Sequence, residues 1–385
     1  MSHPARAIVS REALGEDFRG WQMEDVMVRS PKARELLVQM VACGICQTDI
    51  AAGSAPTGVH GSFYPRILGH EGSGYVLQVG EDVTIAQPGD PVLCSYNFCD
   101  DCQLCKDGCP SHCVNFFTAN SGTRNGADVF KSAHSGTEDT FISGAFFGQS
   151  AFASTTIVSE HSVVNVKGLI TGRDELQLLA PLGCAIQTGT GTVTSTIEAK
   201  SDDIICIQGL GAVGLAAVMG AKIQGCRRII GIDRVRSRFQ IAKRLGVTDI
   251  VDTANLDGKT LQQAVNEVSD GIGPSITVDT TGVGSLIDAG IAYTRPKGKY
   301  VQVGSPEAGH RINFDSFSWL FSGKQLLSVV EGQVRAREYI PQLIEWYRKG
   351  LLPIDQLCKT FAAIDFESAL REMRSGATVK PILCW

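Results

Sequence analysis

The segment "CDDCQLCKDGCPSHC" concentrates cysteines at a spacing that suits metal binding. Cys99, Cys102 and Cys105 are each separated by two residues, and Cys109 and Cys113 follow them. Thiolates this close in sequence are typical of tetrahedral zinc ligation rather than of disulfide bonds. We expect Cys99, Cys102, Cys105 and Cys113 to bind one zinc, with Cys109 as the alternative fourth ligand. Four protein ligands leave no position for a substrate, so this zinc should stabilise a loop.

A second set of candidate ligands is spread over distant segments of the chain. Cys46 lies in "CGICQTD", His70 in "LGHEG" and Cys184 in "PLGCAIQTG". Two thiolates, one imidazole and an open fourth position suit a catalytic zinc, which acts as a Lewis acid on a bound hydroxyl. The alternative is a dithiol redox centre formed by Cys43 and Cys46, which needs both thiols free at a helix N-terminus.

A glycine-rich turn lies in the middle of the sequence. Gly209, Gly211 and Gly214 follow the apolar segment "DIICIQ" and open an apolar helix that we predict over residues 212–224. In this setting the first glycine permits a tight turn and the second lets the backbone approach a pyrophosphate. The third allows the helix to pack closely, and the N-terminus of that helix attracts phosphates. The pattern therefore predicts a dinucleotide site.

The type of dinucleotide depends on the residues after the next apolar segment, "RRIIGID". Asp233 ends this segment, at the position where a carboxylate binds the adenosine ribose. Arg234, Arg236 and Arg238 favour the opposite choice, because they could bind the 2′-phosphate of NADP. Asp233 would repel that phosphate, so we expect NAD rather than NADP.

The surrounding pattern predicts two kinds of structure. Residues 1 to about 185 contain short apolar runs broken by glycine and proline, which indicate a mostly antiparallel β region. From about residue 201, apolar strands alternate with helical segments, as in βαβ units with a parallel sheet. After about residue 330, two short helices close the chain, the second ending at Gly376. The length of 385 residues also favours two domains.

The order of these motifs resembles that of the zinc-dependent medium-chain alcohol dehydrogenases over nearly the whole chain. "AFFGQSAFA", "PLGCAIQTGTGTV" and "VVEGQ" are similar to the aryl-alcohol (benzyl-alcohol) dehydrogenase branch. The resemblance implies an α/β protein with a GroES-like, β-rich catalytic domain and a Rossmann domain with a doubly wound parallel sheet. The first would comprise residues 1–185 and 330–385, and the second residues 186–329.

The resemblance also assigns roles around the metals. It makes Cys46, His70 and Cys184 the catalytic zinc ligands, and it makes the four chosen loop cysteines the structural ones. Thr48 would hydrogen-bond the substrate hydroxyl. Asp49 would orient His70 through its other ring nitrogen, and Glu71 would lie close behind the metal.

Further roles implied by the resemblance concern the cofactor. Thr188 would lie beside the nicotinamide, Val213 would support the face of its ring, and Lys380 would approach the pyrophosphate. The implied reaction is reversible hydride transfer between an alcohol and NAD, in an enzyme with two zinc ions per chain. The implied substrate is an aromatic or otherwise bulky primary alcohol. Six aromatic residues are candidates for its pocket: Tyr96, Phe116, Phe117, Phe146, Phe147 and Trp319.

Three alternatives to this function remain at the level of sequence. The first is a tailoring dehydrogenase of a biosynthetic pathway, and the second is a thiol-adduct (hydroxymethyl) dehydrogenase. The third is a zinc- and NAD-binding protein without turnover.

Two positions depart from the family pattern. Gln47 stands where relatives often carry a basic residue that touches the pyrophosphate, so we expect looser cofactor binding. Ala51 stands where many relatives carry a relay histidine. We expect the proton to pass from Thr48 through the ribose hydroxyls of the cofactor to water, with His60 the nearest histidine in sequence.

The overall composition limits the partners. The chain is 43% hydrophobic and 19% charged, as in globular proteins, and its net charge of −5 gives no electrostatic reason to expect nucleic acid or an anionic membrane. The first thirty residues lack the apolar core of a secretory signal. Together with thirteen cysteines, this favours a cytoplasmic, thiol-reducing location. The family resemblance implies a homo-oligomer, either a dimer or a tetramer.

Overall fold

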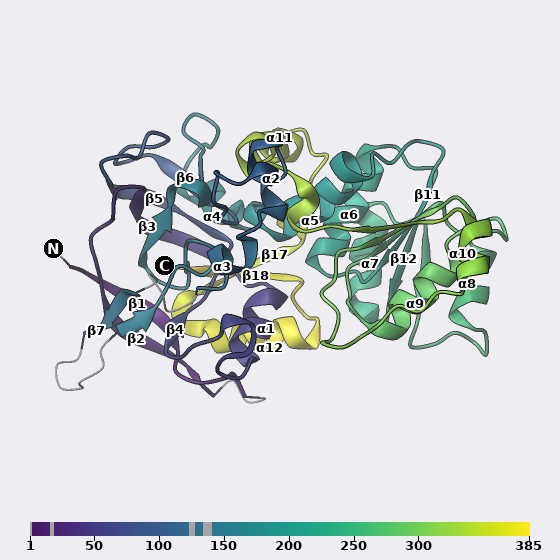
Figure 1. Cartoon of the computed structure of the whole chain (residues 1–385), viewed down its shortest axis with the longest axis horizontal. Helices are drawn as coiled ribbons and strands as arrows, with labels where there is room; N and C mark the ends of the chain where they lie inside the picture. The colour runs from purple at the N-terminus through teal and green to yellow at the C-terminus, as the bar shows by residue number, and fades with distance from the viewer. Residues whose placement is uncertain (1, 16–18, 123–127, 134–140) are drawn as a thin grey trace. The chain divides into compact units, whose positions relative to one another are not determined.

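The computed structural model describes residues 2–15, 19–122, 128–133 and 141–385, except for the side chain of His60. The chain forms two compact units (Figure 1). The first unit comprises Met1–Cys184, Arg335–Arg348 and Leu357–Trp385, and the second comprises Ala185–Val334 and Lys349–Gln356. The division after Cys184 lies one residue before the predicted boundary, and residues 349–356 group with the second unit.

The first unit is built mainly from antiparallel strands. Their bounds are β1 His3–Ser10, β2 Trp21–Val28, β3 Glu35–Gly44, β4 Arg66–Ile67, β5 Gly72–Val79, β6 Pro91–Cys94, β7 Asp128–Ser132, β8 Phe141–Ser143, β9 Thr155–Ser159, β10 Val163–Asn165, β17 Cys358–Ala362 and β18 Lys380–Cys384. Strands β1, β2, β7, β8 and β4 close a barrel. A seven-stranded sheet has the order β10-β6-β5-β3-β18-β17, and β9 also pairs with β3. This arrangement confirms the predicted β-rich domain.

Short helices connect these strands. They are α1 Gln47–Ser54, α2 Gln103–Lys106, α3 Phe116–Asn120, α4 Arg173–Leu178, α11 Ala336–Arg348 and α12 Phe366–Ser375. Helix α12 ends before Gly376, whose φ of 76° closes the helix in the left-handed conformation that glycine adopts without strain. The chain then returns as β18, which pairs with the end of β3 and places Leu383 opposite Cys43. The C-terminal strand therefore lies beside the segment that leads to Cys46.

The second unit is a doubly wound sheet with helices. Its strands are β11 Ile204–Gln208, β12 Arg228–Asp233, β13 Asp249–Asp252, β14 Ile276–Asp279, β15 Lys299–Gln302 and β16 Gln325–Ser328. Its helices are α5 Ala185–Gly191, α6 Ala212–Ile223, α7 Phe239–Leu245, α8 Leu261–Glu267, α9 Gly284–Tyr293 and α10 Ser316–Ser322. All strand pairs are parallel, in the order β13-β12-β11-β14-β15-β16. This is the order of a Rossmann dinucleotide-binding domain, which confirms the predicted fold.

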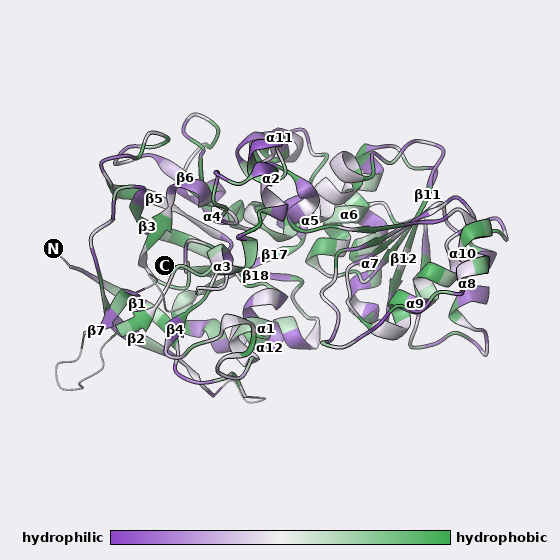
Figure 2. Cartoon of the chain, in the orientation of Figure 1, coloured by the Kyte–Doolittle hydropathy of each residue, from purple (hydrophilic) through white to green (hydrophobic). Residues whose placement is uncertain are grey.

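Buried apolar segments hold each unit together. Every residue of β11 is buried, as expected for a central strand that is covered on both faces. Helix α6 is apolar on nearly all sides because it contacts α5 and α7 as well as β11 and β12. The hydrophobic colour of β3 and α6 in Figure 2 follows from this burial. Among the residues that the structure describes, no helix is long and apolar enough to span a membrane.

Candidate active site and metal centres

Helix α1 carries the first predicted ligand and is held at both ends. Cys46 precedes its first turn, where the backbone N–H of Cys46 donates to Oδ2 of Asp49 at 2.9 Å. At the other end, the Tyr64 hydroxyl donates to the carbonyl oxygens of Gly53 and Ala55 at 3.0 and 2.7 Å. A helix of eight residues is marginal alone, so these contacts fix the position of Cys46.

The outer face of α1 carries Thr48, where the predicted proton path begins, and Ala51, where many relatives carry a relay histidine. Thr48 and Ala51 are both exposed, and a spacing of three residues places them on one face of the helix. Gln47 is exposed as well. Thr48 therefore has room for a ligand, and an alanine beside it leaves open the space that a histidine side chain would occupy.

Asp49 connects the helix to His70. Its Oδ1 lies 2.7 Å from Nδ1 of His70 and accepts a hydrogen bond from the N–H of Gly69 at 3.1 Å. Both Asp49 and His70 are fully buried. Burial opposes protonation of His70, but the neighbouring Asp49 carboxylate and the Cys46 thiolate raise its pKa well above the usual value. With Nδ1 bound to the carboxylate, Nε2 is left as the ligand atom, and it has no hydrogen-bond partner among the described residues.

Four ligand side chains meet at this point in the first unit. Ligand atoms of Cys46, His70, Glu71 and Cys184 all lie within 4.8 Å of one another, and all four residues are buried. A hydrogen bond from Cys184 lowers the pKa of Cys46 well below its usual value, against the opposing effect of burial. Two thiols, an imidazole nitrogen without a protein partner and a carboxylate therefore fit a zinc ion.

Cys184 is positioned by close backbone packing. The preceding residue, Gly183, lies against β6, where an added Cβ would come 1.9 Å from the carbonyl oxygen of Cys94. The hydroxyl of Ser95 donates to the carbonyl oxygen of Gly183 at 2.7 Å. Only a glycine fits here, and it holds the ligand that follows it.

Glu71 and Lys380 form a buried ion pair behind the ligands. Nζ of Lys380 lies 2.9 Å from both carboxylate oxygens of Glu71 and 3.0 Å from the carbonyl oxygen of Ile45. Burial raises the pKa of Glu71 to about 7, although Lys380 opposes this. An added Cβ at Gly44 would lie 2.0 Å from Glu71 Oε2, so the carboxylate occupies space that only a glycine leaves.

Lys380 was expected to approach the pyrophosphate of the cofactor. The structure places its ammonium group instead against Glu71 and Ile45, with a side chain that is 1% exposed. These contacts use the three N–H donors of the ammonium group. A pyrophosphate contact would require one of them to be exchanged, and it stays a prediction.

A strained loop covers the other side of His70. Residues 145, 147 and 150 have positive φ although none is glycine, and Gly148 does as well. Within this loop Gln149 is fully buried, and its Nε2 donates to the carbonyl oxygens of His70 and Ser95 at 2.8 and 3.0 Å. Gln149 thus fixes the backbone of a metal ligand. The segment "AFFGQSAFA" contains it, but sequence reasoning assigned it no role.

The same loop presents two aromatic rings to His70. The ring of Phe147 stacks on the imidazole with centroids 4.5 Å apart and planes at 28°, and Phe146 meets it edge-on at 5.6 Å. Phe116 contacts Phe147, and Tyr96 contacts Phe116. Of the six aromatic residues that we considered, four therefore gather near the metal ligands.

The two other aromatic residues lie elsewhere. Phe117 is 58% exposed. Trp319 belongs to the second unit, where its ring packs on Phe314 at 4.5 Å. A role for these two residues in the substrate pocket stays a prediction.

The loop cysteines form the second candidate metal centre. The sulfur atoms of Cys99, Cys102, Cys105 and Cys113 lie 3.4 to 4.0 Å apart in the pairs that contact one another. Zinc–sulfur bonds of about 2.3 Å in a tetrahedron place sulfurs about 3.8 Å apart, so the cluster fits a zinc ion. Backbone N–H groups, above all that of Asp101, lower the pKa of Cys99 to about 6. Cys109 is exposed and lies outside this group.

Cys43, the other half of the possible redox pair, is fully buried in β3. Its thiol donates to the carbonyl oxygen of Gly44 at 3.3 Å, and burial raises its pKa well above the usual value. A reactive dithiol needs an accessible thiol that ionises readily. The geometry therefore favours the metal site over the redox centre.

The glycine turn of the second unit has the geometry that its sequence predicts. Gly209 follows β11 with a φ of 88°. An added Cβ at Gly214 would lie 1.8 Å from the carbonyl oxygen of Gly209, so α6 packs directly on the turn. At Gly211, an added Cβ would meet no atom within 4 Å. The backbone there is open to a pyrophosphate at the start of α6.

Asp233 closes the adenosine side of this site. Its carboxylate accepts hydrogen bonds from the N–H groups of Leu210, Arg234 and Val235, at 2.7 to 2.8 Å. Arg238 also binds it, at 3.1 Å. Two of the arginines that could favour NADP are thus paired with acidic residues, Arg238 with Asp233 and Arg236 with Asp252. This arrangement favours NAD, as expected.

Thr188 and Val213 lie on α5 and α6, two helices that pack closely together. An added Cβ at Gly189 would lie 2.1 Å from the carbonyl oxygen of Val213, so the two helices touch through their backbones. Thr188 is nearly buried, and its hydroxyl lies 3.4 Å from Oε2 of Glu331. Glu331 lies in the segment "VVEGQ", whose pattern alone indicated no role for it.

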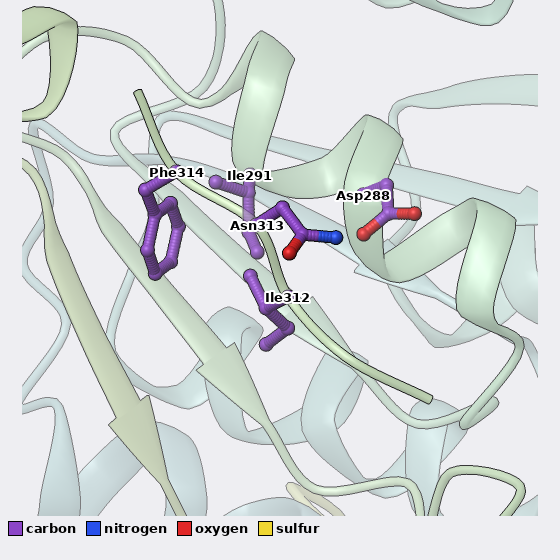
Figure 3. A pocket seen from close by; sticks show the side chains of 5 residues that line it. All are labelled: Asp288, Ile291, Ile312, Asn313 and Phe314. Atoms are coloured by element: carbon purple, nitrogen blue, oxygen red, sulfur yellow. The ribbon is translucent and has the colours of Figure 1, made fainter. Parts of the chain in front are cut away.

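A pocket of the second unit contains none of the predicted site residues. It has a volume of about 150 Å³ and is lined by Asp288, Ile291, Ile312, Asn313 and Phe314 (Figure 3). Ligand pockets usually enclose about 300–1,000 Å³, so this one is small for a substrate.

A Rossmann unit and a buried site of two thiolates and an imidazole together define the class of zinc-dependent dehydrogenases. Residues 32–168 match the alcohol dehydrogenase GroES-like domain, and residues 212–349 match the zinc-binding dehydrogenase domain. The chain is 32% identical over 384 residues to a geraniol dehydrogenase of Castellaniella defragrans, covering 98% of this chain and 97% of that protein.

Solved structures give the same result. A benzyl alcohol dehydrogenase of Acinetobacter calcoaceticus is 34% identical, with a TM-score of 0.86 over 99% of both chains. An alcohol dehydrogenase zinc-binding domain protein of Burkholderia ambifaria is 32% identical, with a TM-score of 0.90 over 100% of this chain and 99% of that one. The chain belongs to the zinc-dependent medium-chain alcohol dehydrogenases, and it is an oxidoreductase that uses zinc and NAD.

Proposed function

We propose that the protein oxidises primary alcohols whose hydroxyl-bearing carbon is attached to an aromatic ring or a double bond, reversibly and with NAD. The observation that carries this proposal is the group of aromatic rings at His70, with Phe147 stacked on the imidazole and Phe146 edge-on. Flat, unsaturated groups pack favourably on such rings. Geraniol and benzyl alcohol, which name two relatives, both have this structure.

The side chains of the site have separate tasks in this reaction. Zinc, when bound by Cys46, His70 and Cys184, supplies Lewis-acid polarisation of the alcohol oxygen. Thr48 would hydrogen-bond the substrate hydroxyl and accept its proton, which would then leave through the ribose hydroxyls of the bound cofactor to water. Asp49 holds the imidazole of His70 in the tautomer that leaves Nε2 for the metal.

A substrate panel tests the proposal. We expect kcat/KM with NAD to be highest for benzylic and allylic alcohols and lower for ethanol, in protein that contains two zinc ions per chain. Equal rates for ethanol and benzyl alcohol would contradict the proposal. A preference for an S-hydroxymethyl thiol adduct or for a polycyclic alcohol would support the other dehydrogenase alternatives, and zinc-loaded protein without turnover would support the non-catalytic one.

Two variants distinguish a specific effect of the aromatic rings at His70 from a general loss of activity. Phe147→Ala should lower kcat/KM for benzyl alcohol about tenfold more than for ethanol. A contact between two aromatic rings contributes about 0.5–1.5 kcal/mol to binding, in addition to the effect of the area that it buries. Phe117→Ala, at an aromatic residue of the same unit that is 58% exposed, is the matched control and should leave this ratio unchanged.

We also propose that a second copy of the chain covers an apolar surface of the second unit. Helix α10 exposes Phe317, Leu320 and Phe321, each more than 70% accessible, and β16 beside it is the last strand of the sheet. Exposed apolar patches and free sheet edges are usual sites of association. The apolar walls that Ile291, Ile312 and Phe314 give the nearby pocket (Figure 3) suit a partner side chain.

Sedimentation measures this association directly. We expect a dimer or tetramer for the unaltered protein and a monomer for Phe321→Glu. The same measurement on Phe117→Glu, which changes an exposed phenylalanine in the first unit, is the control. An unaltered protein that sediments as a monomer at micromolar concentration would overturn the association.

The thiolate ligands of the two candidate metal sites support a reducing compartment, the cytoplasm, as the place of action.

A further inference from the structure

The segment that follows β16 has an unusual backbone. Glu331, Gly332 and Gln333 are consecutive residues with φ of 53°, 67° and 52°. A positive φ is uncommon for residues other than glycine and costs free energy, so it persists only where the surroundings enforce it. Such strain concentrates at ligand sites, which makes the turn Glu331–Gln333 a candidate for function.

The surroundings that enforce this turn belong to α5 and the residues after it. An added Cβ at Gly332 would lie 2.5 Å from the carbonyl oxygen of Gln187, so the two backbones are in direct contact. The hydroxyl of Thr196 donates to the carbonyl oxygen of Gly332 at 2.9 Å. The turn is therefore held against the helix that carries Thr188.

This packing buries the carboxylate of Glu331 against two polar side chains. Glu331 is 7% exposed. Its Oε2 accepts a hydrogen bond from Nε2 of Gln187 at 2.9 Å and lies 3.4 Å from the hydroxyl of Thr188. A carboxylate that is largely removed from water exerts a stronger field on a nearby ligand than an exposed one does.

Strand order indicates which half of the cofactor this carboxylate faces. In a doubly wound sheet, ligands bind at the carboxyl ends of the strands, across the point where the order reverses. That point lies between β11 and β14, and Asp233 ends β12 on the adenosine side. Glu331 follows β16, on the opposite side of β11. The topology thus assigns Glu331 to the nicotinamide half.

Chain connectivity points the same way. Thr188 follows the zinc ligand Cys184 by four residues, which span at most about 14 Å. Hydride transfer needs the nicotinamide and the alcohol at the metal in near-attack geometry. The start of α5, and with it the carboxylate that contacts Thr188, must therefore belong to the nicotinamide end of the site.

We infer that the buried carboxylate of Glu331 makes the site favour the oxidised cofactor over the reduced one. The nicotinamide ring carries a positive charge in NAD⁺ and none in NADH, so a buried carboxylate near it stabilises only the oxidised form. The inference rests on NAD as the cofactor. Its consequence for alcohol oxidation is tighter binding of NAD⁺, the oxidant, without a matching gain in affinity for the product NADH.

Separate binding titrations of the two cofactor forms test this inference. In zinc-loaded protein without alcohol, Glu331→Gln should raise Kd for NAD⁺ about tenfold and Kd for NADH by less than about threefold, as expected for the loss of one charge interaction at the effective dielectric of a protein site. Calorimetry measures NAD⁺ binding, and the fluorescence of the reduced ring measures NADH binding.

Two further variants isolate the charge. Glu331→Asp retains the carboxylate, so its ratio of the two Kd values should stay close to that of the unaltered protein even if both affinities fall. Glu267→Gln is the control, because it removes an exposed carboxylate at the end of α8. This helix returns the chain to the amino edge of the sheet, away from the cofactor side. The variant should change the Kd of neither NAD⁺ nor NADH.

The outcomes are distinguishable. Equal weakening of both forms by Glu331→Gln, or no change in either, would overturn the inference and leave a structural role for the turn. A ratio shift of the same size in Glu331→Asp would also overturn it, because the charge is then irrelevant. Unaltered protein that binds neither NAD⁺ nor NADH would instead refute the cofactor assignment itself.

Discussion

The two candidate metal centres of the first unit share thiolate ligands but are assembled in opposite ways. The loop cluster consists of Cys99, Cys102, Cys105 and Cys113, whose members lie within fourteen positions of one another, and it is closed by four sulfurs. The active-site centre gathers Cys46, His70 and Cys184 from distant segments and places Glu71 beside them.

The difference lies in what surrounds the ligands. Around the loop cluster, the contacts to sulfur come largely from backbone N–H groups of the same loop, such as those of Cys102 and Asn115. Around the active-site centre, buried side chains hold the ligands: Asp49 binds His70, Gln149 binds its carbonyl oxygen, and Lys380 binds Glu71. A closed centre is therefore assembled locally, whereas a reactive centre needs support from side chains throughout the unit.

The largest effect is expected when one ligand is removed from the active-site centre. Cys46→Ser should lower kcat/KM for the best alcohol by about a thousandfold or more, because Lewis-acid polarisation contributes several kcal/mol. The zinc content should fall from two ions to one, with little change in Tm. Activity and metal content are measured on the same preparation. Cys43→Ala, which changes the buried cysteine outside the centre, is the control and should keep both zinc ions.

Disrupting the ion pair behind the ligands should have the next largest effect. Lys380→Met leaves the Glu71 carboxylate buried without its cation, which should reduce the free energy of unfolding by about 3–5 kcal/mol. The double variant Glu71→Gln with Lys380→Met should regain much of this stability, since no charge is then buried. Denaturant unfolding measures both. A single variant as stable as the unaltered protein would show that the pair does not support the centre.

The corresponding change in the loop cluster should affect stability rather than chemistry. Cys105→Ser should release one zinc and lower Tm by about 5–10 °C, as expected for the loss of a few kcal/mol in a protein of this size. Residual protein at low temperature should keep most of its kcat. Cys109→Ser changes the exposed cysteine of the same loop and should leave Tm unaltered. If Cys105→Ser abolished kcat without lowering Tm, the two centres would not be separate in function.

A subtler change tests the support of a single ligand. Asp49→Asn keeps the size of the side chain but weakens its bond to His70, and such changes typically lower metal affinity by about 10- to 100-fold. Competition with a chelator measures the affinity of each centre. Only the active-site zinc should be lost more easily. Equal loss from the loop cluster would mean that the variant disturbs the whole unit.

The smallest effect is expected at the exposed face of α1. Ala51→His places an imidazole one turn from Thr48, where it can accept a proton only in its neutral form. Hydride transfer in the variant should therefore increase as pH rises through about 6.5, by no more than about tenfold. Pre-steady-state rates against pH measure this, with Ala51→Gln as the control. An unchanged profile would place the relay elsewhere, and the side chain of His60 lies outside the described residues.

Much of the fold was predictable because its signals are local. The turn at Gly209 needs no distant contact to be recognised, since its strand and helix are its neighbours in sequence. The helix ending at Gly376 is another such case. The loop cysteines are a similar local signal. Cys99 and Cys113 are only fourteen positions apart, so the loop can bring its four sulfur atoms into a tetrahedron with little help from the rest of the chain.

Other features of the site could not be read in this way. Lys380 meets Glu71 across 309 positions because β18 pairs with β3, and the register of that pair carries no signal in the motif. Gln149 and Phe147 act through a loop whose left-handed residues only the surrounding packing can enforce. The role of Glu331 depends on the order of the strands, which no single segment reveals.

Residue types and the order of the motifs thus predicted the class of enzyme, which its relatives confirm, and they also predicted two sets of candidate metal ligands and a dinucleotide turn. Each of these predictions depends on residue types at short spacing or on a fixed order of motifs, and both can be read directly from an amino-acid sequence. The tertiary structure was needed to show which buried groups hold those ligands and that the carboxylate of Glu331 lies against Gln187 and Thr188. The physical reason is that burial and Coulomb energies depend on distances in space, which long-range strand pairing sets.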